Sequence, residues 1–350
     1  MIVQDLQPRR FMAKSLLDFT FEILVAAGLS RSDAETIAKY IIQADEIGSD
    51  SHGIFRLPQY IDEIRNGKIK THSNIRIESE TNSTAVVNGD TGFGHLTLKT
   101  ATGLAIKKAS AEGAAWVGVN HGNLAGPGAI WVREILAHDM IGIYGAVGGN
   151  NLVPPWGGTD RLLGSNPIAI GVPGGEESPL VLDMATTVAS NGSVQLKAQQ
   201  GEAMPEGWMV DQEGNPLTDP AKSKEGFLLP VGDYKGFGLA MMVGLLGGVL
   251  NGAAMGRDVT QKSPNIGQFI AAISIDSFGD VETFKRNVDT VARDIRGSGK
   301  LPGVAAVRLP GDAAEAKRLD RLANGIPIGK ELYATLNDVA GKLDVAELAN

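Results

Sequence analysis

The chain has 350 residues, of which 43% are hydrophobic and 21% charged, as in an ordinary soluble protein of one large or two ordinary domains. A net charge of −8 argues against a nucleic-acid surface, which would need clustered Lys and Arg. The absence of cysteine excludes disulfides, zinc ribbons, iron–sulfur clusters and thiol nucleophiles. Nothing in the chain requires an oxidising compartment, so we expect a cytoplasmic protein.

Two apolar segments resemble membrane or export signals. Residues 16–28 are interrupted by Asp18 and Glu22, so we reject a signal peptide. Residues 236–256 are uncharged and long enough to span a bilayer, but seven of these 21 residues are glycine. We predict instead a buried helix in the core of a soluble protein, and no membrane association.

The pattern of apolar residues predicts alternating helices and strands, which indicates α/β layering. Ser30 and Asp33 form a capping box that opens a first helix, and a second begins near Asp50–Ser51 and ends at Gly67. Residues 76–90 alternate like a strand. Further helices are predicted at 96–113, 128–139, 188–200, 236–250, 281–297 and 328–346, and further strands at 114–119, 141–147 and 179–185, after a Gly/Pro-rich stretch at 145–178.

The common nucleotide and metal motifs are missing. The chain has no GxGxxG after an early strand, no GxxxxGK[ST] and no HExxH. We therefore expect no metal centre, and any nucleotide site must be built in another way.

The segment DSHGIFRLPQY at 50–60 concentrates polar groups within eleven residues. His52 and Arg56 are four apart, which would put them on one helical face. There a guanidinium could grip a carboxylate while an imidazole works one turn away. A capped helix start with Arg56 in a salt bridge is an equally good interpretation.

The other histidines differ in their surroundings. His121 follows a predicted strand and precedes glycines, where open α/β sheets place ligand sites, although a loop histidine that caps a helix has the same pattern. For His95 we expect a hydrogen bond that supports a turn. His72 and His138 lie in charged segments and are predicted to be solvated.

Three further stretches could contact a ligand. Asp183 ends an apolar strand and is either a helix N-cap or faces a ligand. Lys235 opens the predicted helix at 236–250, where the helix N-terminus favours a phosphate and Gly236 allows close approach. The loops at 154–158 and 164–174 look too rich in Gly and Pro for regular structure.

In combination, these segments resemble the malate/L-lactate dehydrogenase family of the non-Rossmann type. The resemblance covers about residues 10–345 and rests on DSHGIFRLPQY, NHGNLAG, VPPWGG, LGSNPIAIGVP, LDMATT, YKGFGLA and RLPGD. It implies an oxidoreductase of 2-hydroxy and 2-oxo acids that uses NAD or NADP and forms a homodimer. It also implies a non-Rossmann α/β cofactor domain at 123–300, inserted in a helical and mixed substrate and dimerisation part made of 1–122 and 301–350.

The resemblance assigns roles to individual residues. Arg56 would bind the substrate carboxylate, with Ser51, Tyr60 and Asn123 nearby. One of His121 and His52 would exchange a proton with the substrate oxygen; we favour His121, with His52 orienting the carbonyl. The residues expected along the cofactor are Asn150, Asp183, Met184, Ala185, Lys235, Gly236, Pro310 and Gly311.

Two positions depart from the family pattern. Val119 stands where a serine is usual, and Asn123 stands where a glycine is usual. Both flank His121, so they bear on the identity of the substrate more than on the reaction class. A reductase of cyclic imino acids and a non-catalytic nucleotide-binding protein therefore remain as alternatives.

Overall fold

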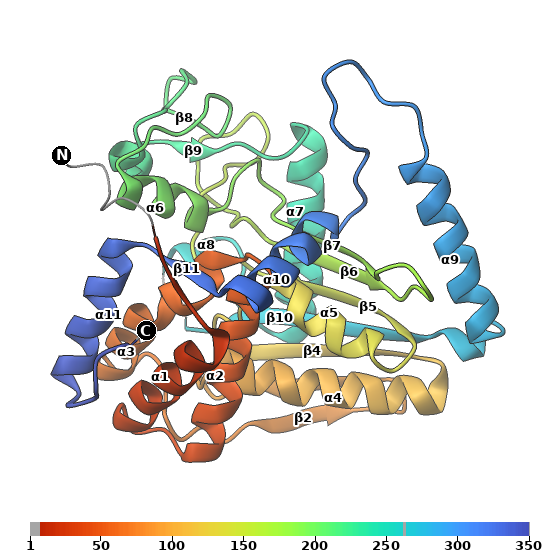
Figure 1. Ribbon diagram of the computed structural model, residues 1–350, viewed down its shortest axis with the longest axis horizontal. Coiled ribbons are helices and arrows are strands. Elements are labelled where there is room, and N and C mark those ends of the chain that lie inside the picture. The colour runs from red at the N-terminus through yellow and green to blue at the C-terminus, as the bar shows by residue number, and fades with distance from the viewer. Residues whose placement is uncertain (1–7, 262–263, 350) are drawn as a thin grey trace.

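The computed structural model describes residues 8–261 and 264–349. A seven-stranded sheet carries helices on both faces, and a cluster of helices from the two ends of the chain lies at one side of the sheet (Figure 1). The α/β fold class predicted from the sequence is confirmed.

The sheet has the order β2-β3-β4-β10-β5-β6-β7. Only β3 and β4 run parallel, and all other neighbours are antiparallel. A Rossmann sheet is mostly parallel, so this sheet agrees with the missing GxGxxG motif. The strands are β2 (Arg76–Glu80), β3 (Thr84–Asn88), β4 (Ala114–Gly122), β5 (Met140–Ala146), β6 (Ile168–Val172), β7 (Leu180–Met184) and β10 (Ile266–Ser274).

Glycines in β5 let helices approach the sheet from both sides. Helices α4 (Gly94–Glu112) and α5 (Gly128–Leu136) cover one face, and α7 (Tyr234–Gly247) covers the other. A Cβ added at Gly142 would lie 3.1 Å from the Cα of Val132 in α5. On the opposite face, a Cβ at Gly145 would lie 3.2 Å from Cγ1 of Val243 in α7 and closer still to the ring of Phe269 in β10. Larger residues at these positions would push the layers apart.

The two ends of the chain share one hydrophobic core. It is built by α1 (Ala13–Ala26), α2 (Arg31–Glu46), α3 (Leu57–Arg65) and α11 (Lys330–Lys342). The short strands β1 (Arg9–Phe11) and β11 (Ile326–Ile328) pair antiparallel and tie the ends together. The predicted capping box is confirmed, since Ser30 Oγ accepts the Asp33 N–H at 3.2 Å. The division of domains at residues 122 and 300 stays a prediction.

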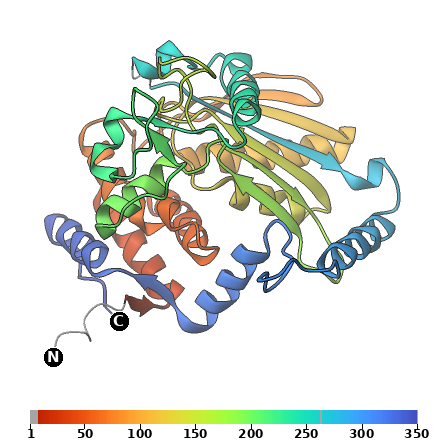
Figure 2. The ribbon, with the colours of Figure 1, turned by 90° about the horizontal axis from the view of Figure 1, so that it is seen from above.

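The remaining elements lie around the sheet. They are α6 (Asn191–Gln200), the strand pair β8 (Met209–Val210) and β9 (Phe227–Leu228), α8 (Arg257–Thr260), α9 (Val281–Arg296) and α10 (Asp312–Asn324). Helix α9 stands at the edge of the molecule in both views (Figures 1 and 2). Ion pairs from Arg293 and Arg296 to Glu177 hold it there.

Several sequence predictions were wrong in detail. Residues 76–90 form a hairpin of two strands, because a turn at 81–84 interrupts them. The segment 164–174 contains β6, whose glycine lies against α5. Strand β10 and helix α10 were not predicted at all.

The prediction of a buried helix at 236–256 was also wrong. Helix α7 ends at Gly247, and only one side of it, which includes Ala240, Val243 and Gly244, is buried. Its outer residues are exposed, including Met242 at 51% and Leu250, just beyond the helix, at 61%. Among the described residues, no helix has both the length and the hydropathy needed to cross a bilayer.

Candidate active site

The sequence analysis predicted a single helix for the segment that carries His52 and Arg56, and this prediction was wrong. Residues Asp50–His52 and Ile54–Arg56 form two successive 3₁₀ turns, and α3 begins only at Leu57. A buried side chain causes the break: the Ile54 N–H donates to the Asp45 carboxylate at 2.7 Å. A Cβ at Gly53 would lie 2.5 Å from Oδ2 of Asp45 and closer still to Oδ1. His52 and Arg56 therefore share a braced turn and not a helical face.

A residue from the far end of the chain holds the same turn. Arg321 of α10 is only 7% exposed, and its guanidinium binds the Asp50 carboxylate, with Nη2 at 3.1 Å from Oδ2, and the carbonyl of Asp45. Burial raises the pKa of Asp45 well above its usual range, while the Ile54 N–H and Arg321 oppose that shift. The sequence analysis identified neither Asp45 nor Arg321. A signal for Asp45 was present, since this acid falls four residues after Ile41 on the apolar face of α2.

The side chains of the turn interact closely. Ser51 Oγ lies 3.0 Å from His52 Nδ1. Burial, together with the charge of Arg56, lowers the pKa of His52 to about 4. His52 is therefore neutral at neutral pH, which suits a hydrogen-bond partner better than a proton donor.

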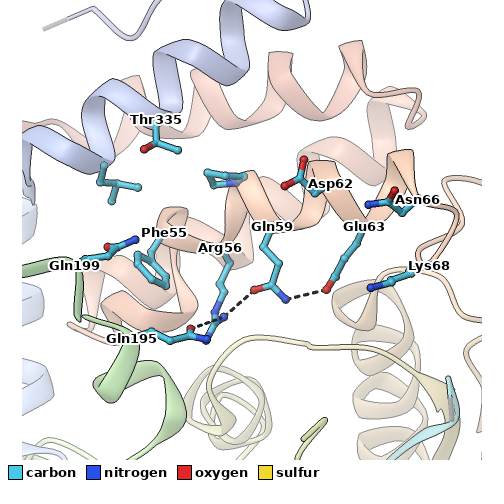
Figure 3. Close-up of a pocket in the computed structure, with 12 residues that line it drawn as sticks. Phe55, Arg56, Gln59, Asp62, Glu63, Asn66, Lys68, Gln195, Gln199 and Thr335 are labelled. Carbon is cyan, nitrogen blue, oxygen red and sulfur yellow. Dashed lines mark hydrogen bonds between the residues drawn. The ribbon is translucent and has the colours of Figure 1, made fainter. Parts of the chain in front are cut away.

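Arg56 is fixed by three contacts. Its Nε donates to the Ser51 carbonyl at 2.7 Å, and its Nη1 donates to Gln59 at 2.7 Å and to Gln195 of α6 at 3.5 Å. Figure 3 shows the continuation of this chain, in which Gln59 Nε2 donates to Glu63 at 2.8 Å. These residues line a polar pocket of about 420 Å³ beside α3, between α6 and α11. A guanidinium in the wall of such a pocket can bind a carboxylate.

His95 does not make the expected turn-supporting hydrogen bond. It lies in α4, fully buried, and neither ring nitrogen has a partner within the described part of the chain. Its ring packs against Tyr40 and Tyr60, with centroids 6.4 and 5.9 Å away. Burial, together with nearby His52, lowers the pKa of His95 to about 3. His95 is a neutral core residue behind the turn.

His121 lies at the end of β4, in the left-handed region with φ of +46°. Its N–H donates to Asn265 Oδ1 at 2.7 Å, and its carbonyl accepts the Thr91 N–H at 2.9 Å. Its Nδ1 is 3.1 Å from Asn120 Oδ1. Bonds on both sides hold the imidazole at the end of a central strand.

The neighbours of His121 have structural contacts of their own. Asn123 Nδ2 donates to the carbonyls of Gly92 and Thr91 at 2.9 and 3.2 Å, which braces the loop before α4. Val119 is fully buried in the sheet. Tyr60 is buried between Phe93 and His95, and burial raises the pKa of its hydroxyl. The substrate contacts assigned to Asn123 and Tyr60 stay predictions.

The residues expected along the cofactor come from four distant segments. Pro310 accepts a hydrogen bond from the Val181 N–H at 3.1 Å, so Pro310 and Gly311 lie beside β7. Thr186 follows Ala185 at the end of β7, and its N–H donates to the carbonyl of Ser165. The Thr186 carbonyl lies 2.7 Å from the position that a Cβ on Gly236 would take, so the end of β7 lies against the start of α7.

Asn150 and Asp183 complete this group. The Asn150 carbonyl lies 3.1 Å from a Cβ position on Gly164, which is next to Ser165. Asp183 Oδ2 accepts the Ala129 N–H at 2.8 Å, so it caps α5, a helix remote in sequence. The loop at 164–166 thus joins the Asn150 segment to the end of β7 and the start of α7.

This arrangement has the chemistry that a dinucleotide requires. Lys235 is exposed in the first turn of α7, so an ammonium and the positive helix end lie together, which suits a pyrophosphate. Amide and backbone groups such as those of Asn150 and Ala185 suit a ribose. Across residues 8–261 and 264–349, no three His, Asp or Glu side chains gather as metal ligands.

The chain is similar to known proteins along almost its whole length. The chain is 37% identical over 329 residues to the malate/(S)-sulfolactate dehydrogenase of Methanothermus fervidus, covering 93% of this chain and 95% of that protein. It is 32% identical over 319 residues to the ureidoglycolate dehydrogenase (NAD(+)) of Escherichia coli, covering 89% and 90%. The structure of malate dehydrogenase from Pyrococcus horikoshii superimposes with a TM-score of 0.90 at 30% identity, covering 99% of this chain and 98% of that one.

The family model for malate/L-lactate dehydrogenase matches residues 11–337. The chain thus belongs to the malate/L-lactate dehydrogenase family and is a nicotinamide-dependent oxidoreductase.

Proposed function

We propose that this protein catalyses reversible hydride transfer between NAD or NADP and a small 2-hydroxy or 2-oxo acid, with Arg56 binding the substrate carboxylate. The observation that carries the proposal is the braced turn, which holds a half-buried guanidinium next to a neutral imidazole. A bidentate pair between Arg56 and a carboxylate would fix the orientation of the acid.

The two histidines have different roles. Because burial keeps His52 neutral, His52 orients the substrate oxygen through a hydrogen bond. His121 takes the hydroxyl proton during oxidation and returns it during reduction. The bound nicotinamide supplies or accepts the hydride.

The cofactor lies along the segments that meet at the end of β7. Lys235 and the N-terminus of α7 bind the pyrophosphate. Asn150, Asp183, Met184 and Ala185 contact the nucleotide from one side, and Pro310 with Gly311 contacts it from the other. The contacts of these segments with one another support this assignment.

The pocket beside Arg56 supports a substrate with a second polar group. Its walls carry the amides of Gln59, Gln195 and Gln199, the charged groups of Lys68, Asp62 and Glu63, and few apolar side chains. An acid with a hydrogen-bonding group at its far end would leave fewer of these polar groups unpaired than lactate would.

The test is a spectrophotometric assay of NADH and NADPH oxidation. The substrates are pyruvate, oxaloacetate, sulfonated and sugar-derived 2-oxo acids, and cyclic imino acids. We expect turnover with a polar 2-oxo acid, and in Arg56→Ala a KM about 10- to 100-fold higher, which corresponds to about 1.4–2.8 kcal/mol. The control is Arg65→Ala, an exposed arginine at the end of the helix that follows the turn. Saturable binding of a dinucleotide without turnover of any substrate would refute the catalytic role.

We also propose a homodimer. Two surfaces of the single chain are unusually apolar for a monomer. One is the outer side of α7 with the turn after it, and the other includes Phe278, which is 81% exposed, and Leu301 beside α9. Light scattering coupled to gel filtration should give twice the mass of the chain, and Leu246→Glu or Val291→Glu would show which surface is the interface.

A further inference from the structure

The Nδ1 atom of His121 lies between two amide side chains. Asn120 Oδ1 is 3.1 Å from it, and Asn88 Nδ2 is 3.3 Å from it. Nδ1 can donate to the first or accept from the second, but not both. The choice fixes which ring nitrogen carries the proton in the neutral histidine.

The orientation of both amides follows from their other partners. Asn120 Nδ2 donates to Glu78 Oε2 at 2.9 Å and to the Asn251 carbonyl at 3.0 Å. A carboxylate oxygen and a carbonyl oxygen can only accept, so the atom of Asn120 that faces them must be the nitrogen. Asn88 Nδ2 donates to Glu78 Oε1 at 2.7 Å, while Asn88 Oδ1 accepts the Asp90 N–H at 2.7 Å. Asn120 thus presents an oxygen to His121, and Asn88 presents a nitrogen.

The Glu78 carboxylate accepts a hydrogen bond from each of the two asparagine amides. Hydrogen bonds from Asn120 and then from Asn88 hold the pKa of the Glu78 carboxyl below its usual range, so it is ionised at neutral pH. The other charged groups in this region are Arg76, 3.2 Å from Glu78, and Asp90, which Lys70 pairs at 2.6 Å. On the side of β10, Asn265 accepts the backbone N–H of His121 and Gln268 pairs with Val119, and neither amide carries a charge.

We propose that Asn120 fixes His121 in the tautomer with its proton on Nδ1, and that Glu78, bound by both asparagines, orients this pair and stabilises the charged imidazole. This rests on the proposed acid–base role of His121. In alcohol oxidation the hydroxyl proton moves to the lone pair of Nε2, and the ring then carries a proton on each nitrogen. In reduction Nε2 gives the proton back. Glu78, Asn88 and Asn120 are thus positioning residues, since they act through His121.

The first test reads the tautomer without substrate or cofactor. The protein is labelled with ¹⁵N in histidine, and long-range proton–nitrogen correlation spectra are recorded above pH 7.5, with His121→Gln used to assign the ring. We expect the Nδ1–H tautomer at His121 in the wild type and a shift toward Nε2–H in Asn120→Ala. An Nε2–H ring in the wild type overturns the proposal.

The second test reads the pH dependence of oxidation. Glu78→Gln keeps the size and one acceptor but removes the charge. The limb of the kcat/KM profile that reports His121 should move to lower pH by about half a unit to one unit, because the imidazolium loses a nearby anion. The turnover number should fall about 3- to 10-fold at unchanged dinucleotide Kd. Glu80→Gln is the matched control, since Glu80 lies on the same strand but pairs with Lys108.

The outcomes separate this inference from the proposed function. If His121→Gln retains turnover, the catalytic assignment fails. If His121→Gln is inactive but Glu78→Gln and Glu80→Gln share the wild-type profile, only the role of Glu78 is refuted. A lower melting temperature of Glu78→Gln without a shift of the limb also refutes it, since that result indicates a purely structural role.

Discussion

Gly53 has no room for a side chain, and Gly53→Ala is therefore a direct test of how the active-site turn is held. The added Cβ would lie 2.5 Å from Oδ2 of the Asp45 carboxylate and closer to Oδ1. Either the turn or the carboxylate must move. Asp45 is 2% exposed and surrounded by the helical core, so it has little space to retreat.

The cost follows from two effects at the same place. Overpacking a tight site typically costs about 1–3 kcal/mol. If the carboxylate moves away, the Ile54 N–H, which is buried, loses its acceptor at a cost of about 1–3 kcal/mol. One displacement produces both, so we expect a total of about 2–4 kcal/mol, which is within the stability of a typical folded protein.

The assay combines thermal unfolding with steady-state kinetics. Gly53→Ala should lower the melting temperature and raise the substrate KM more than 10-fold, because His52 and Arg56 flank the displaced residue, while the dinucleotide Kd stays within about 2-fold. Gly103→Ala is the control: it lies inside α4, a Cβ there meets no atom within 4 Å, and alanine favours helix by about 0.5–1 kcal/mol. A Gly53→Ala protein with wild-type KM would show that the turn does not position the substrate groups.

Three more predictions concern other parts of the site. Arg321→Met should raise the substrate KM several-fold at unchanged dinucleotide Kd, since the change releases Asp50 but touches no cofactor segment. Arg318→Met, which loses the ion pair with Glu315, is the control, and equal kinetics in the two variants would contradict the role of Arg321 in holding the substrate turn. The contribution of His52 and His95 to folding stability should fall as the pH drops from about 6.5 toward 4, because their pKa values are lowered to about 4 and about 3 and the unfolded chain binds those protons first; each contributes a slope of up to about 1.4 kcal/mol per pH unit. The raised pKa values of Asp45 and Asp183 act in the opposite direction, so the test compares the denaturant unfolding of two proteins: the stability of His52→Gln should rise relative to that of the wild type as the pH falls. Lys235→Ala should raise the dinucleotide Kd about 10-fold in fluorescence titrations without changing the melting temperature, since its side chain is exposed; an unchanged Kd would remove Lys235 from the cofactor site.

The parts of the fold that depend on local pattern could be predicted from the sequence. Helix α4 and strand β4 follow from their periodicity and from Gly113, which ends the helix with φ of +86°. The cap at Ser30 follows from residue types three apart. The family assignment came from several motifs together, because each motif alone has a plain structural interpretation.

The errors lie where a distant residue decides the local structure. The turn after Asp50 breaks because Asp45 offers an acceptor to Ile54 and because Arg321, more than 250 residues away in sequence, binds Asp50. Strand β10 is buried between β4 and β5, so its apolar run shows no alternation by which to recognise it. The burial of α7 was overestimated because mean hydropathy does not show that one side of the helix is buried while large residues such as Met242 and Leu246 face outward.

Helix α10 connects the two halves of the proposed site. Gly311 at its N-terminus packs against β7, and Asp312 in its first turn binds Arg296 at 2.7 Å. Arg321 in its last turn binds the substrate turn through Asp50. A helix of 13 residues is about 20 Å long and rigid over that length. The segment proposed to contact the cofactor and the clamp on the substrate turn therefore belong to one element, so a displacement of Gly311 on dinucleotide binding would be transmitted to Asp50. This arrangement predicts that dinucleotide increases the hydrogen-exchange protection of residues 50–56 in the wild type, and that Arg321→Met, which breaks the connection at its far end, abolishes that gain.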